Sequence, residues 1–232
     1  MVRGRAAMFR RVPWFWTRPR HYPSVPDSPP IPAFLPLSLL EALRNLDTPV
    51  EDGLEILAKD IVSRRLGLSD TVAAQIERYR QASGREGSVA DDELVSVLRL
   101  VGRRPDAPLV FADAGRRAAR YAVRARGGAR ALVRVSPSTL GQHLARRAVR
   151  RISEASFRGE LMGKGPDLEV RMSRPLSISA IPDGGACAFY GAAYGELLRS
   201  LVNFEGTMVH ERCEGRGDQA CVWRAQRAGD YE

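Results

Sequence analysis

The pattern of apolar and polar positions divides the chain into two parts. Before about residue 160, apolar residues recur every three or four positions, which is typical of amphipathic helices. The pattern predicts helices at residues 35–46, 51–68, 70–84, 88–102, 107–125 and 136–155. In the last of these, the predicted buried stripe is Leu140, Leu144, Ala148 and Ile152.

Two helix ends carry recognisable signals. Gly84 stands where a C-cap glycine would end the helix at 70–84. Ser88 and Asp91 stand at capping-box spacing, with Asp in place of the usual Glu, and predict the start of the helix at 88–102.

After about residue 160 the pattern changes to alternation. Residues 167–172 and 176–181 are predicted as strands, 187–202 as a helix, and 204–213 with 220–226 as a strand pair. Gly215, Gly217 and Asp218 supply turn residues between the last two strands. The order favours an α+β fold, with a helical front half packed on a small antiparallel sheet.

Residues 1–33 have a different composition. They contain six arginines, one acidic residue and seven prolines, and this density of proline excludes a regular helix or a central strand. Aromatic residues lie among the arginines, including Trp14, Phe15 and Trp16. Such a segment is typical of an interface with a protein partner or a membrane surface, and equally of a disordered basic tail without a partner.

Length and composition fit one globular domain at 34–232 after this tail. The chain has 232 residues, of which 44% are hydrophobic. No apolar run approaches the roughly 20 residues of a membrane helix, and the basic N-terminus lacks a signal-peptide core. We therefore expect an unprocessed cytoplasmic protein, with peripheral attachment to the cytoplasmic face of the inner membrane as a second option.

The formal net charge is +9 and almost all positive charge is arginine. Eleven arginines and no acidic residue lie between Ala114 and Ile152. They suit solvated helix faces, or an anionic ligand or partner such as propionate groups or phosphate lipid. No nucleic-acid-binding signature accompanies them, so we expect no nucleic-acid partner.

The cysteines give the clearest chemical hypothesis. Cys187, His210, Cys213 and Cys221 could form a closed Cys3His zinc site that ties a C-terminal hairpin to the preceding helix. An odd number of cysteines suits a metal or structural thiols better than disulfides. The spacings are not those of zinc fingers, so three structural cysteines and a surface histidine remain the alternative.

The sequence around these residues resembles a known domain. A Cys opens a glycine- and aromatic-containing helix in CAFYGAAYG, and HERC and GDQACVW follow in the hairpin. This pattern, over about residues 167–228, resembles the 4-vinyl-reductase-type domain. That domain occurs in a bacteriochlorophyll biosynthesis protein once assigned as a divinyl reductase, in effector domains of phenol- and toluene-sensing activators, and in stand-alone small-molecule-binding proteins.

The resemblance implies a ligand set for the metal. Sensor members bind zinc through a Cys, an acidic residue and two further Cys. Cys187, Cys213 and Cys221 match directly, whereas the acidic position falls on His210, with Glu211 beside it. Because strand residues alternate between faces, only one of the two should face the metal, and we favour His210.

The resemblance also implies a ligand-binding role more than a catalytic one. It implies a largely apolar pocket between helices and sheet, for which the candidate ligand-binding residues are Tyr121, His143, Phe189, Tyr190 and Tyr194. Each of these aromatic residues also suits core packing, and His143 also suits an exposed position. No dinucleotide or flavin motif supplies a hydride source.

Three functions are compatible with the resemblance. The first is a non-catalytic protein that binds a tetrapyrrole or bacteriochlorophyll precursor, or assists pigment–protein assembly, with residues 1–33 docking on a membrane-associated complex. The second is a sensor or adaptor for a small aromatic ligand, signalling through homodimer contacts. The third is a 4-vinyl reductase that depends on a partner for electrons.

Overall fold

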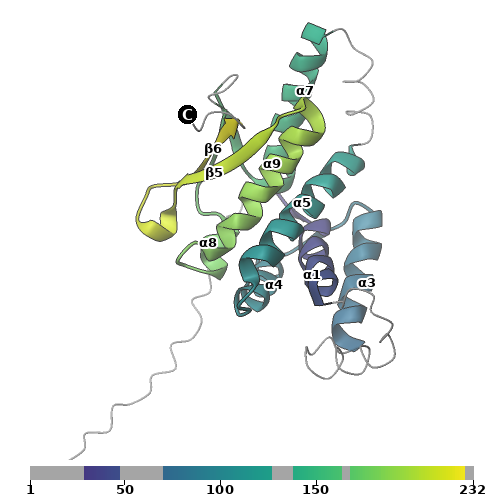
Figure 1. Cartoon of the computed structure of the whole chain (residues 1–232). Helices are drawn as coiled ribbons and strands as arrows, with labels where there is room; N and C mark the ends of the chain where they lie inside the picture. Colours follow the sequence, from purple (N-terminus) through teal and green to yellow (C-terminus); the bar gives the residue numbers. More distant parts are fainter. Residues whose placement is uncertain (1–28, 48–69, 127–137, 164–167, 228–232) are drawn as a thin grey trace, which may run out of the picture.

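A computed structural model describes residues 29–47, 70–126, 138–163 and 168–227 (Figure 1). The predicted helix at 51–68 and most of the predicted tail at 1–33 lie outside these residues. Within the described ranges the chain is mainly helical with small antiparallel sheets. The predicted α+β class is therefore confirmed.

Four helices make up the front half of the chain. They are α1 (Phe34–Asp47), α3 (Asp70–Gly84), α4 (Asp91–Gly102) and α5 (Ala107–Ala125). Helix α1 packs against the other three. The apolar stripes of α1, α4 and α5 contribute to the main core, whereas Ile76 and Tyr79 of α3 form a smaller cluster with Leu37 and Leu40 of α1. Two short strands, β1 (Ile31–Pro32) and β2 (Ser88–Val89), pair beside α1, and Ile31 is buried although it falls in the predicted tail.

The second half contains the larger sheet. Helix α7 (Ser138–Ile152) continues into a π-helical turn (Ser153–Phe157), and the strands are β3 (Glu160–Met162), β4 (Glu169–Met172), β5 (Gly206–Arg212) and β6 (Cys221–Arg227). All pairs in this sheet are antiparallel, in the order β3-β4-β6-β5. The predicted strands at 167–172, 204–213 and 220–226 are confirmed within a few residues.

Helix α9 (Ala188–Val202) lies between the front-half helices and this sheet (Figure 1). It packs along α5 on one side and against β5 on the other. The approach to α5 is close because α5 presents small residues there; a Cβ on Gly115 would overlap the Phe189 backbone. Toward the sheet, Tyr190 and Tyr194 pack against the ring of Trp223, with centroids 5.9 and 6.1 Å away.

The segment predicted as a strand at 176–181 is instead a helix, α8 (Leu176–Ala180). Pro175 fixes the backbone before its first turn, and the apolar alternation is too short to impose a strand. Ser177 and Ala180 are buried, while Leu176 and Ile178 are only half-buried, so the buried set does not follow the alternation of apolar residues. This arrangement places the Ser177 hydroxyl in the interior, where it contacts Cys187.

The predicted capping box at Ser88 is also wrong. Ser88 lies in β2, and α4 begins at Asp91 after Ala90, without a side-chain cap. Asp91 is not free to cap because its carboxylate accepts two hydrogen bonds from Arg158, both 2.8 Å long. This ion pair links the start of α4 to the turn that follows α7.

The buried stripe of α7 differs from the predicted one. Ala145, Val149 and Ile152 are buried, whereas Leu144 and Ala148 are only half-buried and the side chain of Leu140 lies outside the description. The helix is therefore rotated by about one residue, or roughly 100°, from the expected orientation. Its opposite face carries the exposed residues Gln142, His143, Arg146, Arg147, Arg150 and Arg151.

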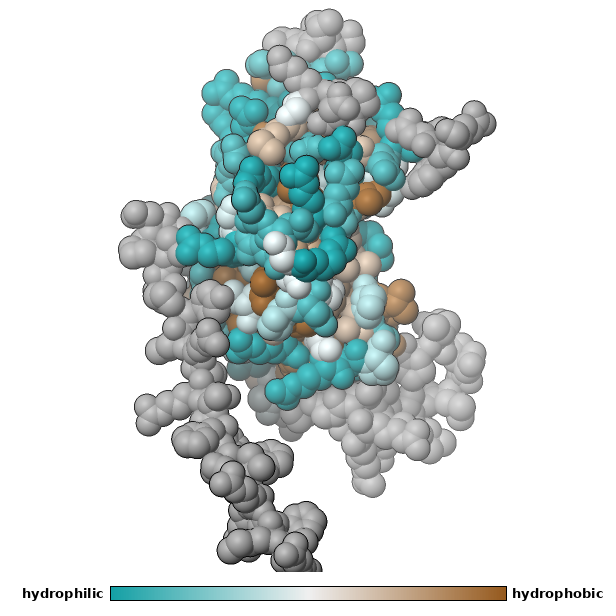
Figure 2. Space-filling view, turned by 90° about the vertical axis from the view of Figure 1, so that its left-hand side faces the viewer, coloured by the Kyte–Doolittle hydropathy of each residue, from teal (hydrophilic) through white to brown (hydrophobic). Residues whose placement is uncertain are grey.

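The face of the molecule that carries the β5–β6 hairpin is mainly hydrophilic, and its hydrophobic residues form small separate spots (Figure 2). Among the described residues, no helix is both long enough and apolar enough to cross a bilayer.

Candidate metal centre

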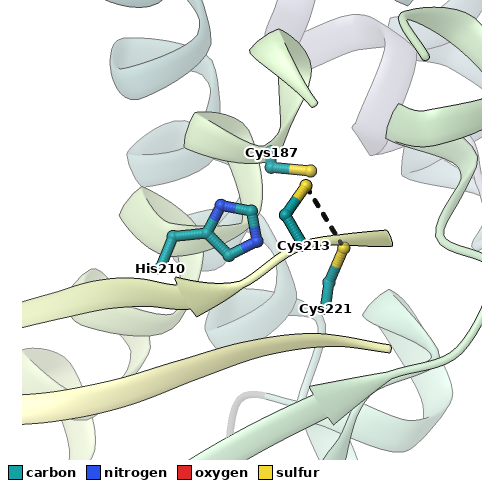
Figure 3. A group of neighbouring side chains, drawn as sticks. All are labelled: Cys187, His210, Cys213 and Cys221. Atoms are coloured by element: carbon teal, nitrogen blue, oxygen red, sulfur yellow. Dashed lines mark hydrogen bonds between the residues drawn. The ribbon is translucent and has the colours of Figure 1, made fainter. Parts of the chain in front are cut away.

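Four segments bring the predicted metal-binding residues together. Cys187 ends the 3-10 turn Gly185–Cys187 that leads into α9. His210 lies in β5, Cys213 directly follows that strand, and Cys221 opens β6. The four side chains point toward one another (Figure 3). Their potential ligand atoms all lie within 4.8 Å of one another.

This spacing fits a tetrahedral ion. In a tetrahedron with metal–sulfur bonds of about 2.3 Å, neighbouring sulfurs are about 3.8 Å apart. The sulfurs of Cys213 and Cys221 are 4.0 Å apart. A disulfide would need about 2.05 Å, and all three cysteines are free thiols. The group can therefore hold a metal ion without rearrangement of the backbone.

The histidine supplies an independent sign of a missing partner. His210 Nε2 is buried and has no hydrogen-bond partner among the described residues. Buried polar nitrogens are nearly always paired, so an unpaired one beside three thiols indicates a ligand position. The ring is held by stacking on Trp223, with centroids 4.6 Å apart and an interplanar angle of 11°.

Several residues that sequence analysis did not assign to the site support the thiols. Ser177 Oγ lies 3.2 Å from Cys187 Sγ. Asp218 Oδ2 accepts a 2.7 Å hydrogen bond from the backbone N–H of Cys213. Gly184 adopts φ +86°, and a Cβ there would lie 2.5 Å from Cys213 Sγ. The Pro182-Asp183-Gly184-Gly185 sequence was the available signal for this turn.

The thiols share a proton when no metal is bound. The hydrogen bond between Cys187 and Cys221, together with burial, raises the pKa of Cys187. The same hydrogen bond lowers the pKa of Cys221 to about 4. The lowered pKa favours the thiolate of Cys221, which is the form that binds a metal.

The structure places His210, and not Glu211, in the metal-binding group. Glu211 Oε1 instead lies 3.0 Å from Arg224 Nε on the other face of the sheet. A register shift between His210 and Arg212 leaves Glu211 as the extra residue of a β-bulge. Of the two candidate ligands that strand alternation left open, the structure therefore brings His210 close to the thiols.

A separate cavity of about 430 Å³ lies between the helices and the sheet. Its apolar lining comes from α7, β3, α9 and β6, with Leu168 and Phe204 from the connecting segments. The lining residues are Gln142, Arg146, Val149, Leu161, Leu168, Leu198, Val202, Asn203, Phe204, Glu205, Ala225 and Arg227. Five of these are exposed, so the cavity opens to the surface.

The five predicted ligand-binding residues do not line this cavity. Phe189, Tyr190 and Tyr194 are buried in the core. Tyr121 donates a 2.8 Å hydrogen bond to Glu41 Oε2, and His143 is exposed on α7. Their contact with a ligand stays a prediction, and no sequence pattern distinguished the cavity residues from ordinary core residues.

The metal-binding group and the cavity occupy opposite ends of the same two elements. Cys187 and Cys221 stand at the starts of α9 and β6, whereas Leu198, Val202 and Ala225 line the cavity near their ends. Along α9, which rises about 1.5 Å per residue, Cys187 lies roughly 16–22 Å from Leu198 and Val202. Along β6, which rises about 3.3 Å per residue, Cys221 lies roughly 13 Å from Ala225. A metal at the first site would therefore not touch a molecule in the cavity.

Comparisons with protein-family models, with curated proteins and with solved structures found no match to this chain.

Proposed function

We propose that this chain is a non-catalytic small-molecule-binding protein in which a structural zinc ion holds the C-terminal hairpin on α9. The observation that carries the proposal is the open cavity of about 430 Å³, which lies within the usual 300–1,000 Å³ range of ligand pockets. Its apolar walls suit the body of a hydrophobic ligand. Gln142 and Arg146 at the opening suit a carboxylate or phenolate end.

The zinc assignment rests on the donor set. Three thiolates and an imidazole in a tetrahedral arrangement are typical of structural zinc sites. Four protein ligands leave no open position for water or substrate, so the ion would hold the hairpin on α9 and would take no part in a reaction.

For the ligand, the resemblance to 4-vinyl-reductase-type domains supports a tetrapyrrole or bacteriochlorophyll precursor. Its propionate groups would pair with Arg146, which is exposed at the opening. In this account the chain carries the pigment or assists assembly of a pigment–protein complex in the cytoplasm or at the inner membrane. Residues 1–33, rich in arginine and aromatic residues, would contact the membrane-associated partner.

Cavity size favours a second ligand class, a small aromatic compound. A cavity of about 150 Å³ holds one benzene ring, so 430 Å³ suits two to three rings and only part of a tetrapyrrole. The chain would then act as a sensor or adaptor for that compound.

Titration of the purified chain with a porphyrin carboxylate and with two-ring phenols separates these ligands. We expect saturable binding of at least one, with a shifted Soret band for the porphyrin.

Val202→Phe, at the cavity, should weaken binding at least tenfold because it fills part of the space. The matched control Val97→Phe, a half-buried valine of α4 away from the cavity, should change it less than twofold. Equal effects of the two variants, or no binding of either ligand, would contradict the proposal.

A further inference from the structure

The exposed side of α7 carries an unusual concentration of unpaired positive charge. Arg146, Arg147, Arg150 and Arg151, which we call the α7 arginine face, are all exposed. Within the residues that the structure describes, none of them forms an ion pair. Glu154 and Glu205 are exposed nearby in the turn after α7 and at the cavity, and neither pairs with this face in those residues.

The arginines of α5 provide a contrast within the same arginine-rich stretch. Arg117 pairs with Asp113 at 2.7 Å, and Arg120 lies 3.6 Å from Glu196 of α9. Those charges are neutralised within the fold. The α7 arginine face has no such counter-charge among the described residues, and its like charges repel one another at helical spacing.

We propose that the α7 arginine face is a docking surface for an anionic lipid bilayer. One guanidinium group can donate hydrogen bonds to two phosphate oxygens at the same time. Four guanidinium groups on one helix can therefore bind several lipid headgroups. The match is one of charge: four cations without an ion-pair partner in the described part of the chain face outward, and anionic headgroups supply the complementary charge.

The cavity beside the helix favours lipid over nucleic acid. Arg146 belongs both to this face and to the cavity lining, so a chain docked through α7 holds the opening near the bilayer. Phe204 and Val202, both half-buried at the cavity, add apolar surface at the same place. The exposed positions of α7 include no Phe, Tyr or Trp side chain on which bases could stack.

Vesicle binding by the full chain tests this surface. We expect binding to vesicles rich in phosphatidylglycerol and at least tenfold weaker binding to phosphatidylcholine vesicles. Each basic residue near an anionic surface contributes roughly fivefold, so Arg147→Gln with Arg150→Gln should weaken binding roughly thirtyfold. Both residues lie outside the cavity lining, so metal content and ligand binding should be unchanged.

The matched control is Arg85→Gln with Arg103→Gln, which removes the same charge from exposed positions on other elements. It should reduce vesicle binding less than threefold. An equal loss in both variants would mean that net charge alone attracts the chain, and an unchanged affinity in the α7 variant would assign binding to another segment. Tighter binding to duplex DNA, with displacement from vesicles, would also overturn the proposal. None of these outcomes depends on what the cavity holds.

Discussion

At the scale of single residues, Gly184 makes the closest approach to the metal-binding group. Its φ of +86° disfavours any side chain, and a Cβ would press on Cys213 Sγ. We expect Gly184→Ala to lower the free energy of unfolding by about 2–3 kcal/mol. We also expect at least tenfold weaker metal affinity, because the sulfur must move. Chelator competition and denaturant unfolding measure the two effects.

Gly217→Ala is the matched control, because Gly217 lies in the same hairpin at φ +97° with nothing within 4 Å of a Cβ. It should cost about 1 kcal/mol of stability through backbone strain and leave metal affinity unchanged. Equal metal affinities in the two alanine variants would show that Gly184 does not position the sulfur.

Tyr190 and Tyr194 predict how stability responds to alkaline pH. Burial raises the pKa of both phenols well above the ordinary value of 10.0. In the unfolded chain they ionise near pH 10, so above that pH the folded state holds more protons and stability falls as pH rises. Each tyrosine contributes a slope of up to about 1.4 kcal/mol per pH unit.

Urea unfolding between pH 8 and pH 11, with phenolate absorbance as a second readout, checks this expectation. Tyr190→Phe should make the alkaline decline shallower, because the phenylalanine has no proton to lose. Phenolate absorbance from all the tyrosines while the fold persists would contradict the assigned burial.

At the scale of elements, Arg158 joins three segments. Its guanidinium donates two 2.8 Å hydrogen bonds to Asp91 at the start of α4, and its Nε donates a 2.8 Å bond to the carbonyl of Pro29, before β1. Arg158→Gln should lower the free energy of unfolding by about 1–3 kcal/mol, because a partly buried carboxylate loses both partners. Denaturant unfolding provides the measurement.

The control for Arg158 is Arg117→Gln, which breaks the Arg117–Asp113 pair within α5. A pair within one helix contributes only about 0.3–0.5 kcal/mol, so this variant should be nearly neutral. Comparable losses in the two variants would mean that Arg158 acts as an ordinary surface charge.

Metal removal should act on one end of the fold. The ion would connect the start of α9 with β5, the following turn and β6, so chelation should free the hairpin there. Backbone amides of β5 and residues 214–220 are expected to exchange at least tenfold faster, while those of α1 and α5 keep their protection. Hydrogen exchange followed by mass spectrometry measures this difference in exchange rate between the two regions. A uniform increase in exchange over the whole chain would contradict the prediction.

Sequence patterns predicted the long elements because their apolar periods persist over several turns. The helix at 107–125, for example, matches α5. The patterns failed where an element spans only a few residues. Over Leu176–Ala180 the same letters fit a strand or one turn of helix, and Pro175 with the inward Ser177 decides the outcome through tertiary contacts.

The candidate metal ligands were predictable from the sequence, but the residues that position them were not. Cysteine and histidine are rare in this chain, so their grouping was visible in the sequence. The closeness of Gly184 to Cys213, and the place of the cavity at the far end of α9, depend on how separate elements pack. Aromatic side chains were the natural candidates for a ligand, yet half of the lining residues are aliphatic side chains that resemble the rest of the core.

At the scale of the whole molecule, α9 and β6 connect two specialised ends. One end holds the thiols and histidine, and the other opens into the cavity beside α7. A metal ion at the first end would hold the hairpin on α9 without occupying the ligand space. This separation of a structural metal from a binding cavity underlies the proposed non-catalytic function.

Metal analysis of the purified chain tests the central claim most directly. Native mass spectrometry with elemental analysis should find one zinc per chain, and X-ray absorption should find three sulfur ligands and one nitrogen ligand. Cys213→Ser should lose that metal and unfold at a lower temperature. A chain that is metal-free, equally stable with or without added zinc, and unaffected in stability by Cys213→Ser would contradict the account.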